Sequence, residues 1–461
     1  MIIHKFGGSS VQDAEHILDV VRIVQAYEIE GEDCPVVVVS AMSGVTDLLI
    51  SGGRAAAEGD EEAYRRILKA LEKRHSSALQ KLLEVGGEGE AASKQVGELL
   101  QNLARLYESI AVLGELSPRS GDAVSSAGEL LSSTLVAAAL CDQGTAARAV
   151  SAETLLVTDD QHGRANPLHD LTRVKLNQVV IPMLKANIIP VITGFIGATE
   201  QGVTTTLGRG GSDFTAAIIG ANLDADEVWI WSDVDGILTA DPNIVPRART
   251  LDVLTYAEAA ELAEYGAEVL HPRTIQPLAD AGIPLRILNS FQPDCPGTLI
   301  HPQPGTNRRL QTAIISANGM SLVTIGGGRS WGLAEAAEIL ARLGRERVDV
   351  RMFSQSFSDH RLNLVVSSSD TSHCISVVQD VGLDGENRLQ FMENAATVSV
   401  VSPTHRDVGI VSRAFQALGA CGTRVIAVAQ ASTEFSVSFC IPEEQLFETV
   451  RHLHHALGLE G

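Results

Sequence analysis

Short runs of β-branched residues separated by helical stretches constrain the fold of this chain more than any other feature. The runs are largely apolar and lie at residues 35–40, 187–193, 227–232 and 283–288. Strands that are apolar on both sides must be covered on both faces, which is typical of parallel sheets packed between helices. The sequence therefore predicts an α/β domain with a largely parallel sheet.

Residues 55–116 interrupt this alternation with a helical insertion. Apolar residues recur there at helix spacing, namely Val96, Leu99, Leu100, Leu103, Leu106, Ile110 and Leu113. We interpret them as a packing stripe, because residues at this spacing share one helix face. The glycine-rich sequence at 86–89 predicts a break that divides the insertion into two helices.

A proline- and glycine-containing stretch at 302–307 predicts the end of this first domain. An approximate internal repeat follows it. Residues 332–355 and 409–430 each read as a helix and a strand that ends in glutamine, and a second strand follows each copy. Two units with the same order of elements predict two small α+β domains.

The N-terminus leads a short apolar strand through Lys5 directly into Gly7 and Gly8. Glycines let backbone N–H groups point inward, and a helix expected to begin near Ser9 would add the positive end of its dipole. Together with the lysine charge, these groups predict a site for the terminal phosphates of a nucleotide. The alternative from these residues alone is a tight turn beside a solvated lysine.

Composition limits the partners and the compartment. The formal net charge of -22 argues against nucleic acid or an anionic membrane as a partner, since both are bound by surplus lysine and arginine. The six cysteines show no C-x-x-C spacing, which favours reduced thiols in a cytoplasmic protein. We expect no signal peptide and no segment long enough to span a bilayer. The histidines within 451–455 are interpreted as solvated.

Other nucleotide-binding and metal-binding patterns fit poorly. The sequence lacks the G-x-x-x-x-G-K-[ST] pattern of a P-loop. Residues 208–213 lack the third glycine and the closely preceding strand of a dinucleotide fingerprint. An EF-hand at 233–236 would need a later glycine, and Ile244 stands where it would need a bidentate glutamate.

The N-terminal segment 5–11, Lys-Phe-Gly-Gly-Ser-Ser-Val, resembles the signature of aspartate kinases, which belong to the amino-acid kinase superfamily. Further matching segments follow in order at 40–46, 126–130, 193–197, 204–216, 231–236 and 269–272. The resemblance extends along essentially the whole chain. It implies an amino-acid kinase domain, a three-layer αβα sandwich with a mainly parallel sheet, followed by two ferredoxin-like ACT domains.

The resemblance also implies the domain limits. The catalytic domain would comprise residues 1–302, with the helical insertion at 55–116, and the first ACT domain 319–390. The second ACT domain would combine 303–318 with 391–461, because in that family the first ACT unit is inserted into the second.

The implied activity is transfer of the ATP γ-phosphoryl group to the side-chain carboxylate of L-aspartate. The product, 4-phospho-L-aspartate, begins the biosynthesis of lysine, threonine and methionine, with feedback through the ACT domains. A carboxylate is already ionised at neutral pH, so the task is alignment and neutralisation of anionic charge. We expect Mg²⁺ to be held mainly by the nucleotide, with no metal site on the protein, and a homodimer or larger homo-oligomer through the ACT domains.

The resemblance assigns a role to each matching site residue. Lys5 would bridge the transferring phosphoryl oxygens, and Asp213 would orient Lys5 or the magnesium shell. Arg209 would clamp the α-carboxylate of the substrate, and Glu129 would hold its α-ammonium group. Further substrate contacts would come from Thr46 and Ser212, and ATP contacts from Gly7, Gly8, Ser9, Ser232 and Asp233.

A different interpretation of the charged residues is possible without the resemblance. Arg209 and Asp213 would then cap and neutralise a helix beginning near Ser212, because an acid in a first helical turn is common. Glu129 would be an exposed helix residue.

Three positions depart from the family pattern. Leu238 and Asn243 stand where many members carry tyrosine and arginine, and Glu268 stands where lysine is usual. An anion beside the triphosphate would weaken ATP binding unless a cation compensates. The candidates for such a compensating cation are Arg247, Arg249 and Arg273. Glu268 keeps open the alternative of a catalytically weak amino-acid sensor, whereas a glutamate kinase is disfavoured by the tandem repeat and by residues 126–129.

The repeat indicates an effector. Gln355 and Gln430 end equivalent strands and resemble glutamines that bind threonine in threonine-responsive aspartate kinases. An amide donates and accepts hydrogen bonds, which suits threonine, whereas the lysine ammonium group would need an acid, for which Asp349 is available. Threonine is therefore favoured over lysine as the effector. The alternative is that both glutamines satisfy exposed strand ends.

Overall fold

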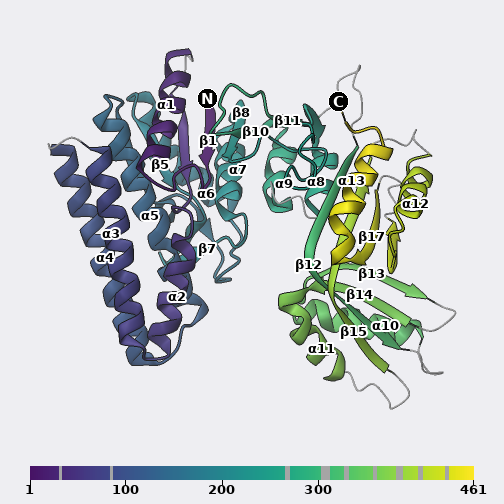
Figure 1. The fold of residues 1–461 in the computed structure, drawn as a ribbon. Coiled ribbons are helices and arrows are strands. Elements are labelled where there is room, and N and C mark those ends of the chain that lie inside the picture. The colour runs from purple at the N-terminus through teal and green to yellow at the C-terminus, as the bar shows by residue number, and fades with distance from the viewer. Residues whose placement is uncertain are drawn as a thin grey trace. The chain divides into compact units, whose positions relative to one another are not determined.

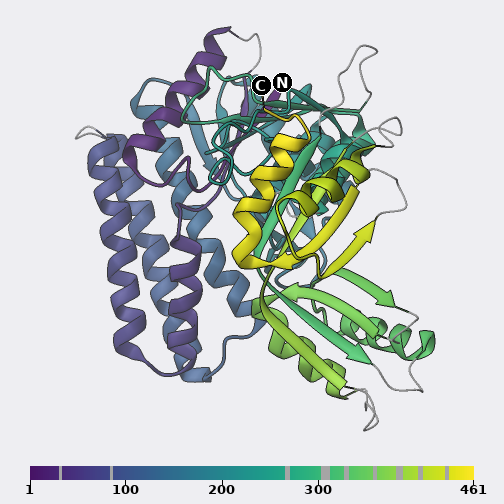
Figure 2. The same cartoon turned by 45° about the vertical axis from the view of Figure 1, so that its right-hand side comes forward.

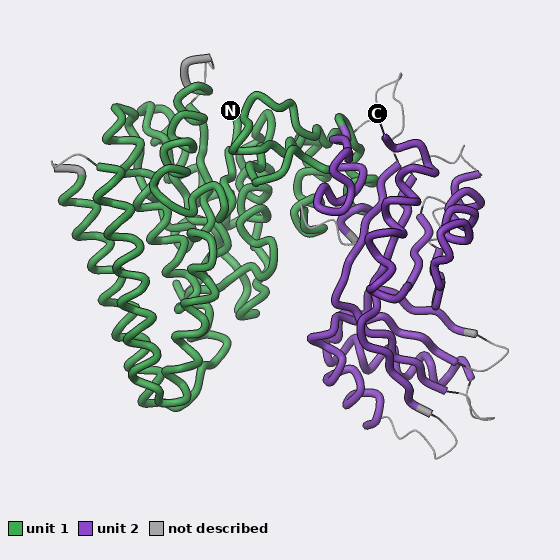
Figure 3. The backbone as a smooth tube through the Cα atoms, viewed as in Figure 1, with its two compact units in different colours: residues 1–237, 252–260, 269–304 green, residues 238–251, 261–268, 305–461 purple. Residues whose placement is uncertain are grey.

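The computed structural model describes residues 1–30, 34–83, 87–264, 270–302, 312–326, 332–356, 361–380, 388–402, 409–430 and 436–460. The chain forms two compact units, which Figure 3 shows in different colours. Unit 1 contains Met1–Ile237, Asp252–Ala260 and Val269–Pro304. Unit 2 contains Leu238–Leu251, Glu261–Glu268 and Gly305–Gly461. The chain therefore passes between the units several times.

Unit 1 is built on an eight-stranded sheet with the order β3-β5-β2-β1-β8-β10-β11-β9. Figure 1 labels several of these strands. Neighbouring strands run parallel except β10 and β11, which confirms the prediction of a mainly parallel sheet. All four valines of β2 are buried, as expected for a strand covered on both faces. The strands are β1 (Ile2–Phe6), β2 (Val36–Val39), β3 (Ala147–Val150), β5 (Ile189–Thr193), β8 (Glu227–Ser232), β9 (Val253–Thr255), β10 (Leu285–Asn289) and β11 (Thr298–His301).

A smaller sheet and a set of helices complete unit 1. The small sheet has the order β4-β6-β7, with β4 (Val157–Thr158), β6 (Ile196–Thr199) and β7 (Thr204–Thr206). The helices are α1 (Ala14–Glu30), α2 (Val45–Ala57), α3 (Glu61–Leu82), α4 (Gly87–Leu113), α5 (Pro118–Asp142), η1 (Ala152–Thr154), α6 (His169–Lys185), α7 (Gly211–Leu223), α8 (Tyr256–Glu264) and α9 (Pro272–Ala281). The last residues of α8 belong to unit 2.

The predicted helical insertion forms α3 and α4, which pack with α2 and α5 (Figure 1). In the predicted apolar stripe, Val96, Leu103 and Ile110 are buried. Leu113 instead has 71% of its surface exposed, because it is the last residue of α4. The stripe is therefore a packing surface over most of its length.

Gly52 on α2 lies against Tyr107 on α4. A Cβ atom at Gly52 would lie 2.5 Å from the Tyr107 hydroxyl oxygen, and this hydroxyl donates a hydrogen bond to the Leu49 carbonyl over 2.8 Å. We expect Gly52→Ala to lower the free energy of unfolding by about 1–3 kcal/mol, because an overpacked core must shift.

The matched control is Gly97→Ala within α4, where a Cβ atom would meet no described heavy atom within 4 Å. This substitution should raise the free energy of unfolding by roughly 0.5–1 kcal/mol, because alanine loses less backbone entropy than glycine in a helix. Urea unfolding measures both variants. Changes of the same sign would contradict the packing described here.

Helix α5 corrects one expectation. By length and composition this helix of 25 residues could cross a membrane, although no such segment was expected. Its most apolar window is 89% buried inside the protein, where α5 packs against β3, β5 and neighbouring helices. The hydropathy of α5 is therefore explained by its place in the core of unit 1.

Unit 2 is built on a six-stranded sheet with the order β13-β14-β12-β15-β17-β16. All neighbouring strands are antiparallel. The strands are β12 (Ala313–Gly326), β13 (Val350–Ser356), β14 (Arg361–Ser367), β15 (Arg388–Val401), β16 (Ala427–Gln430) and β17 (Ser436–Pro442). The helices are α10 (Leu333–Arg345), η2 (Ser368–Asp370), α11 (Thr371–Asp380), α12 (Ile410–Ala420), η3 (Glu443–Gln445) and α13 (Leu446–Ala456).

The predicted repeat is present in unit 2. Each copy consists of a helix, two strands, a 3₁₀ turn and a second helix. The long strands β12 and β15 serve both copies: Met320–Gly326 of β12 pairs with β14, whereas Ala313–Ala317 pairs with the part of β15 that also pairs with β17. Ile314 accordingly packs in one cluster with α12 and α13. The fold class is confirmed, and the domain limits proposed from the sequence stay predictions.

The segment 238–251 is part of unit 2, although it follows β8 of unit 1 in the sequence. Its Ile244 and Val245 pack in the cluster of α12 and α13. His454 contributes a hydrogen bond of 3.0 Å between its Nε2 and Thr239 Oγ1. The interpretation of the terminal histidines as solvated is therefore wrong for His454, which is fully buried, and burial lowers the pKa of this imidazole.

Candidate active site

Lys5 lies on β1, between the central strands β2 and β8. Only 7% of the residue is exposed, and its ammonium group forms an ion pair of 2.5 Å with Asp213 in the first turn of α7. A buried lysine needs such a partner, because an isolated charge is costly to remove from water. The alternative of a solvated lysine is therefore wrong, whereas the role of Asp213 in orienting Lys5 or the magnesium shell stays a prediction.

The turn after β1 differs from the expectation in two respects. The Gly7 N–H donates a hydrogen bond of 3.1 Å to the Trp231 carbonyl, so it is engaged and is not the expected donor to phosphate. Helix α1 begins at Ala14 rather than near Ser9, because the Asp13 carboxylate accepts a hydrogen bond of 3.1 Å from the His16 N–H at the helix start. The helix dipole is therefore not located at Ser9.

Gly8 is required by close packing. A Cβ atom there would lie 2.9 Å from the Ala41 carbonyl oxygen, and the Gly8 carbonyl accepts a hydrogen bond of 3.1 Å from Ser43 N–H. The turn after β1 is thus held against the turn after β2. Both turns contribute to one pocket of about 360 Å³.

The pocket brings together most of the predicted catalytic and substrate-binding residues. They are Lys5, Gly8, Thr46, Glu129, Arg209, Ser212 and Asp213. These residues come from β1, α2, α5 and the start of α7, which are far apart in the sequence. The predicted nucleotide contacts Gly7, Ser9, Ser232 and Asp233 do not line it.

Further side chains without a predicted role also line this pocket, among them Asp47 and Phe195. Asp47 directly follows Thr46, a predicted substrate contact, so its place in the sequence could have indicated that it lies at the pocket. Phe195 has a φ of 68°, which is unusual for an aromatic residue. Its backbone is held by a hydrogen bond of 3.0 Å from its N–H to Thr215 Oγ1 and by one of 2.9 Å from Leu207 N–H to its carbonyl. It lies within the matching segment 193–197, for which the sequence argument assigned no role.

Glu129 is a buried carboxylate that is only partly satisfied. The residue is 3% exposed, which excludes the alternative of an exposed helix residue. Its Oε1 accepts a hydrogen bond of 3.1 Å from Ala41 N–H, whereas Oε2 is buried with no partner among the described residues. Burial raises the pKa of Glu129 to about 8, against the opposing effect of its backbone hydrogen bonds. The arrangement suits a cationic ligand group.

Arg209 and Ser212 lie on a glycine-rich turn that leads into α7. Gly208 and Gly210 have φ values of 81° and 69°, which favour glycine. Gly194 lies close to Ser212, since a Cβ atom at Gly194 would lie 2.6 Å from the Ser212 side chain. Arg209 is exposed at the pocket. The N-cap of α7 is Gly210, with no side-chain capping bond, so helix capping does not account for Arg209.

Ser232 and Asp233 lie at the carboxyl end of β8, which pairs with both β1 and β10. The Ser232 carbonyl accepts a hydrogen bond of 2.9 Å from Ser290 N–H, and Ser290 Oγ lies 2.8 Å from Ser10 Oγ. These contacts hold together the segments that follow β1, β8 and β10 at one edge of the sheet. In open α/β sheets ligands bind at the carboxyl edge of the strands.

Two of the three positions that depart from the family pattern lie among the described residues. Leu238 and Asn243 belong to the segment of unit 2 described above, and Glu268 lies outside the described residues. Two candidate compensating cations are bound to backbone carbonyls. Arg273 donates to Leu207 over 2.8 Å and to Ala165 over 3.1 Å, and Arg249 donates to Leu459 over 3.1 Å.

The predicted effector residues lie in unit 2. Gln355 is on β13 and Gln430 ends β16, which are the two outer strands of the six-stranded sheet. Asp349 Oδ2 lies 2.9 Å from an Arg351 guanidinium nitrogen. The acid considered for lysine binding is therefore already paired with a cation.

No group of three or more histidine, cysteine, aspartate or glutamate side chains suited to a metal occurs in the described part of the chain. Mg²⁺ commonly binds through one or two carboxylates together with the phosphates of a nucleotide. In the pocket, Asp213 is the carboxylate next to Lys5. This arrangement fits a magnesium ion carried by the nucleotide.

Comparison with known proteins covers both units. Residues 1–289 match the amino acid kinase family, and residues 398–457 match an ACT domain. Aspartokinase 2, chloroplastic, of Arabidopsis thaliana is 30% identical over 470 residues, covering 98% of this chain and 84% of that protein. Lysine-sensitive aspartokinase 3 of Escherichia coli (strain K12) is 30% identical, and the match covers 99% of each chain.

A solved structure resembles the whole fold. It is the crystal structure of E. coli aspartokinase III in complex with aspartate and ADP, in the R-state. The TM-score is 0.83 with 28% sequence identity, and the match covers 99% of this chain and 100% of that chain. Taken with the full-length sequence relatives, this similarity shows that the chain belongs to the aspartokinases of the amino acid kinase family.

Proposed function

We propose that this aspartokinase transfers the γ-phosphoryl group of ATP to the side-chain carboxylate of L-aspartate and forms 4-phospho-L-aspartate. One observation carries the proposal: a single pocket combines the Lys5–Asp213 ion pair with the half-satisfied carboxylate of Glu129 and the exposed Arg209. An amino acid that also carries a reacting carboxylate matches these charges group by group.

Lys5 neutralises charge during the transfer. Both reactants are anions, so the main barrier to their approach is electrostatic repulsion. The Lys5 ammonium group, held by Asp213, contacts the transferring phosphoryl oxygens. Because Lys5 is on a central strand and nearly buried, it needs little reorganisation at the moment of reaction.

Glu129 and Arg209 recognise the groups of aspartate that do not react. The unpartnered Oε2 of Glu129 accepts from the α-ammonium group, and Arg209 binds the α-carboxylate. The hydroxyls of Thr46 and Ser212 complete the substrate contacts. These four residues line one pocket with Lys5, which supports a common ligand.

The nucleotide occupies the neighbouring carboxyl edge of the sheet. Gly8 and Ser9 approach the phosphates, and Ser232 and Asp233 contact the adenosine side. A bound Mg²⁺ would neutralise phosphate charge, and Asp213 would help to hold it beside the phosphates. The cysteines of the described residues form no disulfide with one another, which fits a cytoplasmic enzyme.

The proposal is tested by ADP release in the presence of ATP, Mg²⁺ and one amino acid at a time. We expect turnover with aspartate and little with glutamate, whose longer side chain misplaces the reacting carboxylate relative to Lys5. Amino-acid binding without turnover for any acceptor would favour the catalytically weak sensor instead.

Unit 2 is proposed to bind threonine as a feedback effector and to join copies of the chain through its outer strands. Gln355 and Gln430 lie on equivalent outer strands, and the pairing of Asp349 with Arg351 weakens the case for lysine. The E. coli relative named above is lysine-sensitive. Inhibition by lysine alone would therefore overturn the threonine proposal.

Gln430→Ala should raise the threonine concentration for half inhibition roughly fivefold to thirtyfold, since each lost hydrogen bond is worth about 1 kcal/mol and an amide can make one or two. The uninhibited turnover should not change, because effector coupling is separable from the chemistry. Gln390→Ala on β15 replaces another exposed strand glutamine and is the matched control. Equal inhibition curves for both variants would remove Gln430 from the effector site.

A further inference from the structure

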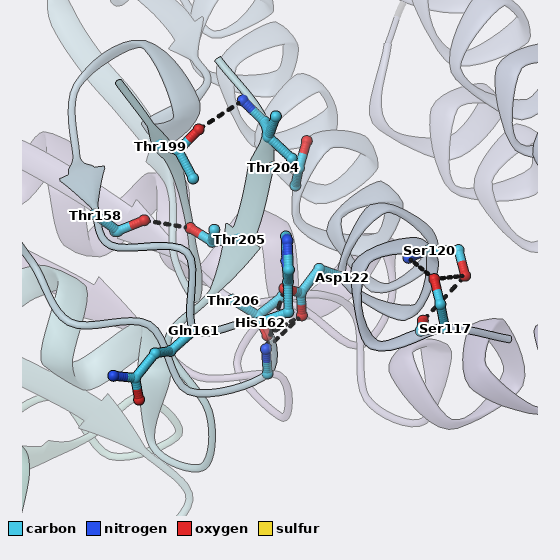
Figure 4. Close-up of polar contacts among 12 residues, drawn as sticks. Ser117, Ser120, Asp122, Thr158, Gln161, His162, Thr199, Thr204, Thr205 and Thr206 are labelled. Atoms are coloured by element: carbon cyan, nitrogen blue, oxygen red, sulfur yellow. Dashed lines mark hydrogen bonds and ion pairs between the residues drawn. The ribbon is translucent and has the colours of Figure 1, made fainter. Parts of the chain in front are cut away.

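A buried polar cluster beside the pocket is not used by the mechanism above. Its centre is Asp122, which is 3% exposed and lies near the start of α5 (Figure 4). Asp122 Oδ1 accepts a hydrogen bond of 2.6 Å from Thr206 Oγ1, and its Oδ2 lies 2.7 Å from His162 Nδ1. The Gly163 N–H donates to both oxygens, over 3.0 and 3.1 Å. The carboxylate is thus fully engaged by the protein.

The cluster connects helix α5, which carries Glu129, with the turn that carries Arg209. Asp122 precedes Glu129 on the same helix by about two turns, so their Cα–Cβ bonds point toward the same side of α5. Thr206 is the last residue of β7 and leads through Leu207 and Gly208 to Arg209. Asp122 therefore links the helix of Glu129 to the turn of Arg209.

Further contacts stiffen the turn on the Thr206 side. The Ala165 N–H donates to the Thr206 carbonyl over 2.9 Å, and Arg273 donates to the carbonyls of both Ala165 and Leu207. A Cβ atom at Gly208 would lie 3.0 Å from the Gly163 carbonyl oxygen. The turn that contains His162 and Gly163 thus packs against the turn that leads to Arg209.

From this arrangement we infer that Asp122 is a positioning residue that sets the spacing between Glu129 and Arg209, and so governs how tightly the α-ammonium and α-carboxylate groups of the substrate are bound. The inference rests on the proposed function, in which these two residues bind the α-ammonium and α-carboxylate groups of one substrate. Those two groups are a fixed distance apart, so binding depends on the spacing of their protein partners. The nucleotide contacts and Lys5 lie on other elements.

The sharpest test compares two neighbouring threonines of β7. Thr206→Val removes the hydroxyl that bonds Asp122, whereas Thr205→Val removes a buried hydroxyl that lies 2.7 Å from Thr158 Oγ1 (Figure 4). Both variants lose one buried hydrogen bond on the same strand. Only Thr206→Val should raise the KM for aspartate, by about tenfold, as expected for a hydrogen bond to a carboxylate. The KM for ATP should stay within about twofold and kcat within about threefold, since neither Lys5 nor the nucleotide side is changed.

Asp122→Asn is the second variant. It keeps the side-chain shape but replaces one accepting oxygen by a donor, so one of its present donors loses its acceptor. It should also raise the KM for aspartate selectively. If Asp122→Asn does not fold, the Thr206→Val and Thr205→Val pair still decides the question.

The inference is overturned if Thr206→Val leaves the KM for aspartate unchanged, or if both threonine variants change all kinetic constants alike. The wild-type assay separates it from the proposed function. A wild type without aspartate-dependent turnover contradicts the function, whereas an active wild type with a normal Thr206→Val variant contradicts only the positioning role.

Discussion

Replacing Lys5 by methionine should reduce aspartate-dependent turnover by about a hundredfold or more. Methionine retains a long flexible side chain but removes the charge, and loss of one preorganised electrostatic group in an active site typically costs about 3 kcal/mol of barrier. Steady-state kinetics with saturating aspartate and ATP measure the effect. Near-normal turnover would contradict the assignment of Lys5.

The buried position of Lys5 determines the controls. A lysine facing solvent could be replaced without consequence for folding, but Lys5 is nearly buried and paired with Asp213. Its removal leaves that carboxylate without its cation, so a thermal melt must show that the variant is folded. Lys94→Met in α4 is the matched control, because Lys94 is exposed and forms a long ion pair of 3.9 Å with Glu98. It should retain full activity.

Glu129→Gln should raise the KM for aspartate by roughly tenfold to a hundredfold, since a hydrogen bond to a charged group is worth about 1.5–3 kcal/mol. Glutamine has nearly the same shape but no charge for the α-ammonium group.

The KM of the wild type for aspartate should also depend on pH. The Glu129 pKa is about 8 without ligand, so below this pH aspartate must bind with release of a proton from Glu129.

The wild-type KM for aspartate should therefore fall as the pH rises from about 6.5 to 8, and Glu129→Gln should lack this change. Substrate binding thus strengthens as the pH rises, whereas the stability of the protein falls. Folding raises the pKa of Glu129 from 4.5 to about 8, so between these values the folded protein holds a proton that the unfolded chain has lost. The stability of the wild type relative to Glu129→Gln should thus fall as the pH rises through this window. A pH-independent KM in both proteins would contradict the role of Glu129.

Local patterns were sufficient to predict a parallel α/β sheet followed by two α+β units, whereas the kinase and ACT folds were implied by the family resemblance. The continuous valines of β2 indicate a strand buried on both faces, and the repeated helix–strand–strand order indicates the two halves of unit 2. The limits of single elements were harder to predict. Helix α1 begins at Ala14 because Asp13 caps it, and α5 is as apolar as a membrane helix because it lies in the core.

The motifs indicated residues that share the pocket, but not the burial or the hydrogen bonds of these residues. Lys5, Glu129 and Arg209 each lie in a recognisable segment, yet nothing local in the sequence shows that Glu129 is buried with one unpartnered oxygen. Asp122 has no local signal either. Its partner Thr206 is 84 residues away in the sequence, and only folding brings the two together. The engaged N–H of Gly7 likewise depends on a distant residue, Trp231.

The most direct measurement is the identity of the phosphorylated product. Incubation of the protein with ATP, Mg²⁺, aspartate and hydroxylamine should yield aspartyl hydroxamate, because hydroxylamine traps an acyl phosphate at the side-chain carboxylate. We expect the hydroxamate at the β-carboxyl group, in amounts equal to the ADP released, and no more than background with Lys5→Met. ADP release from the wild type without hydroxamate would contradict phosphorylation of aspartate by this protein.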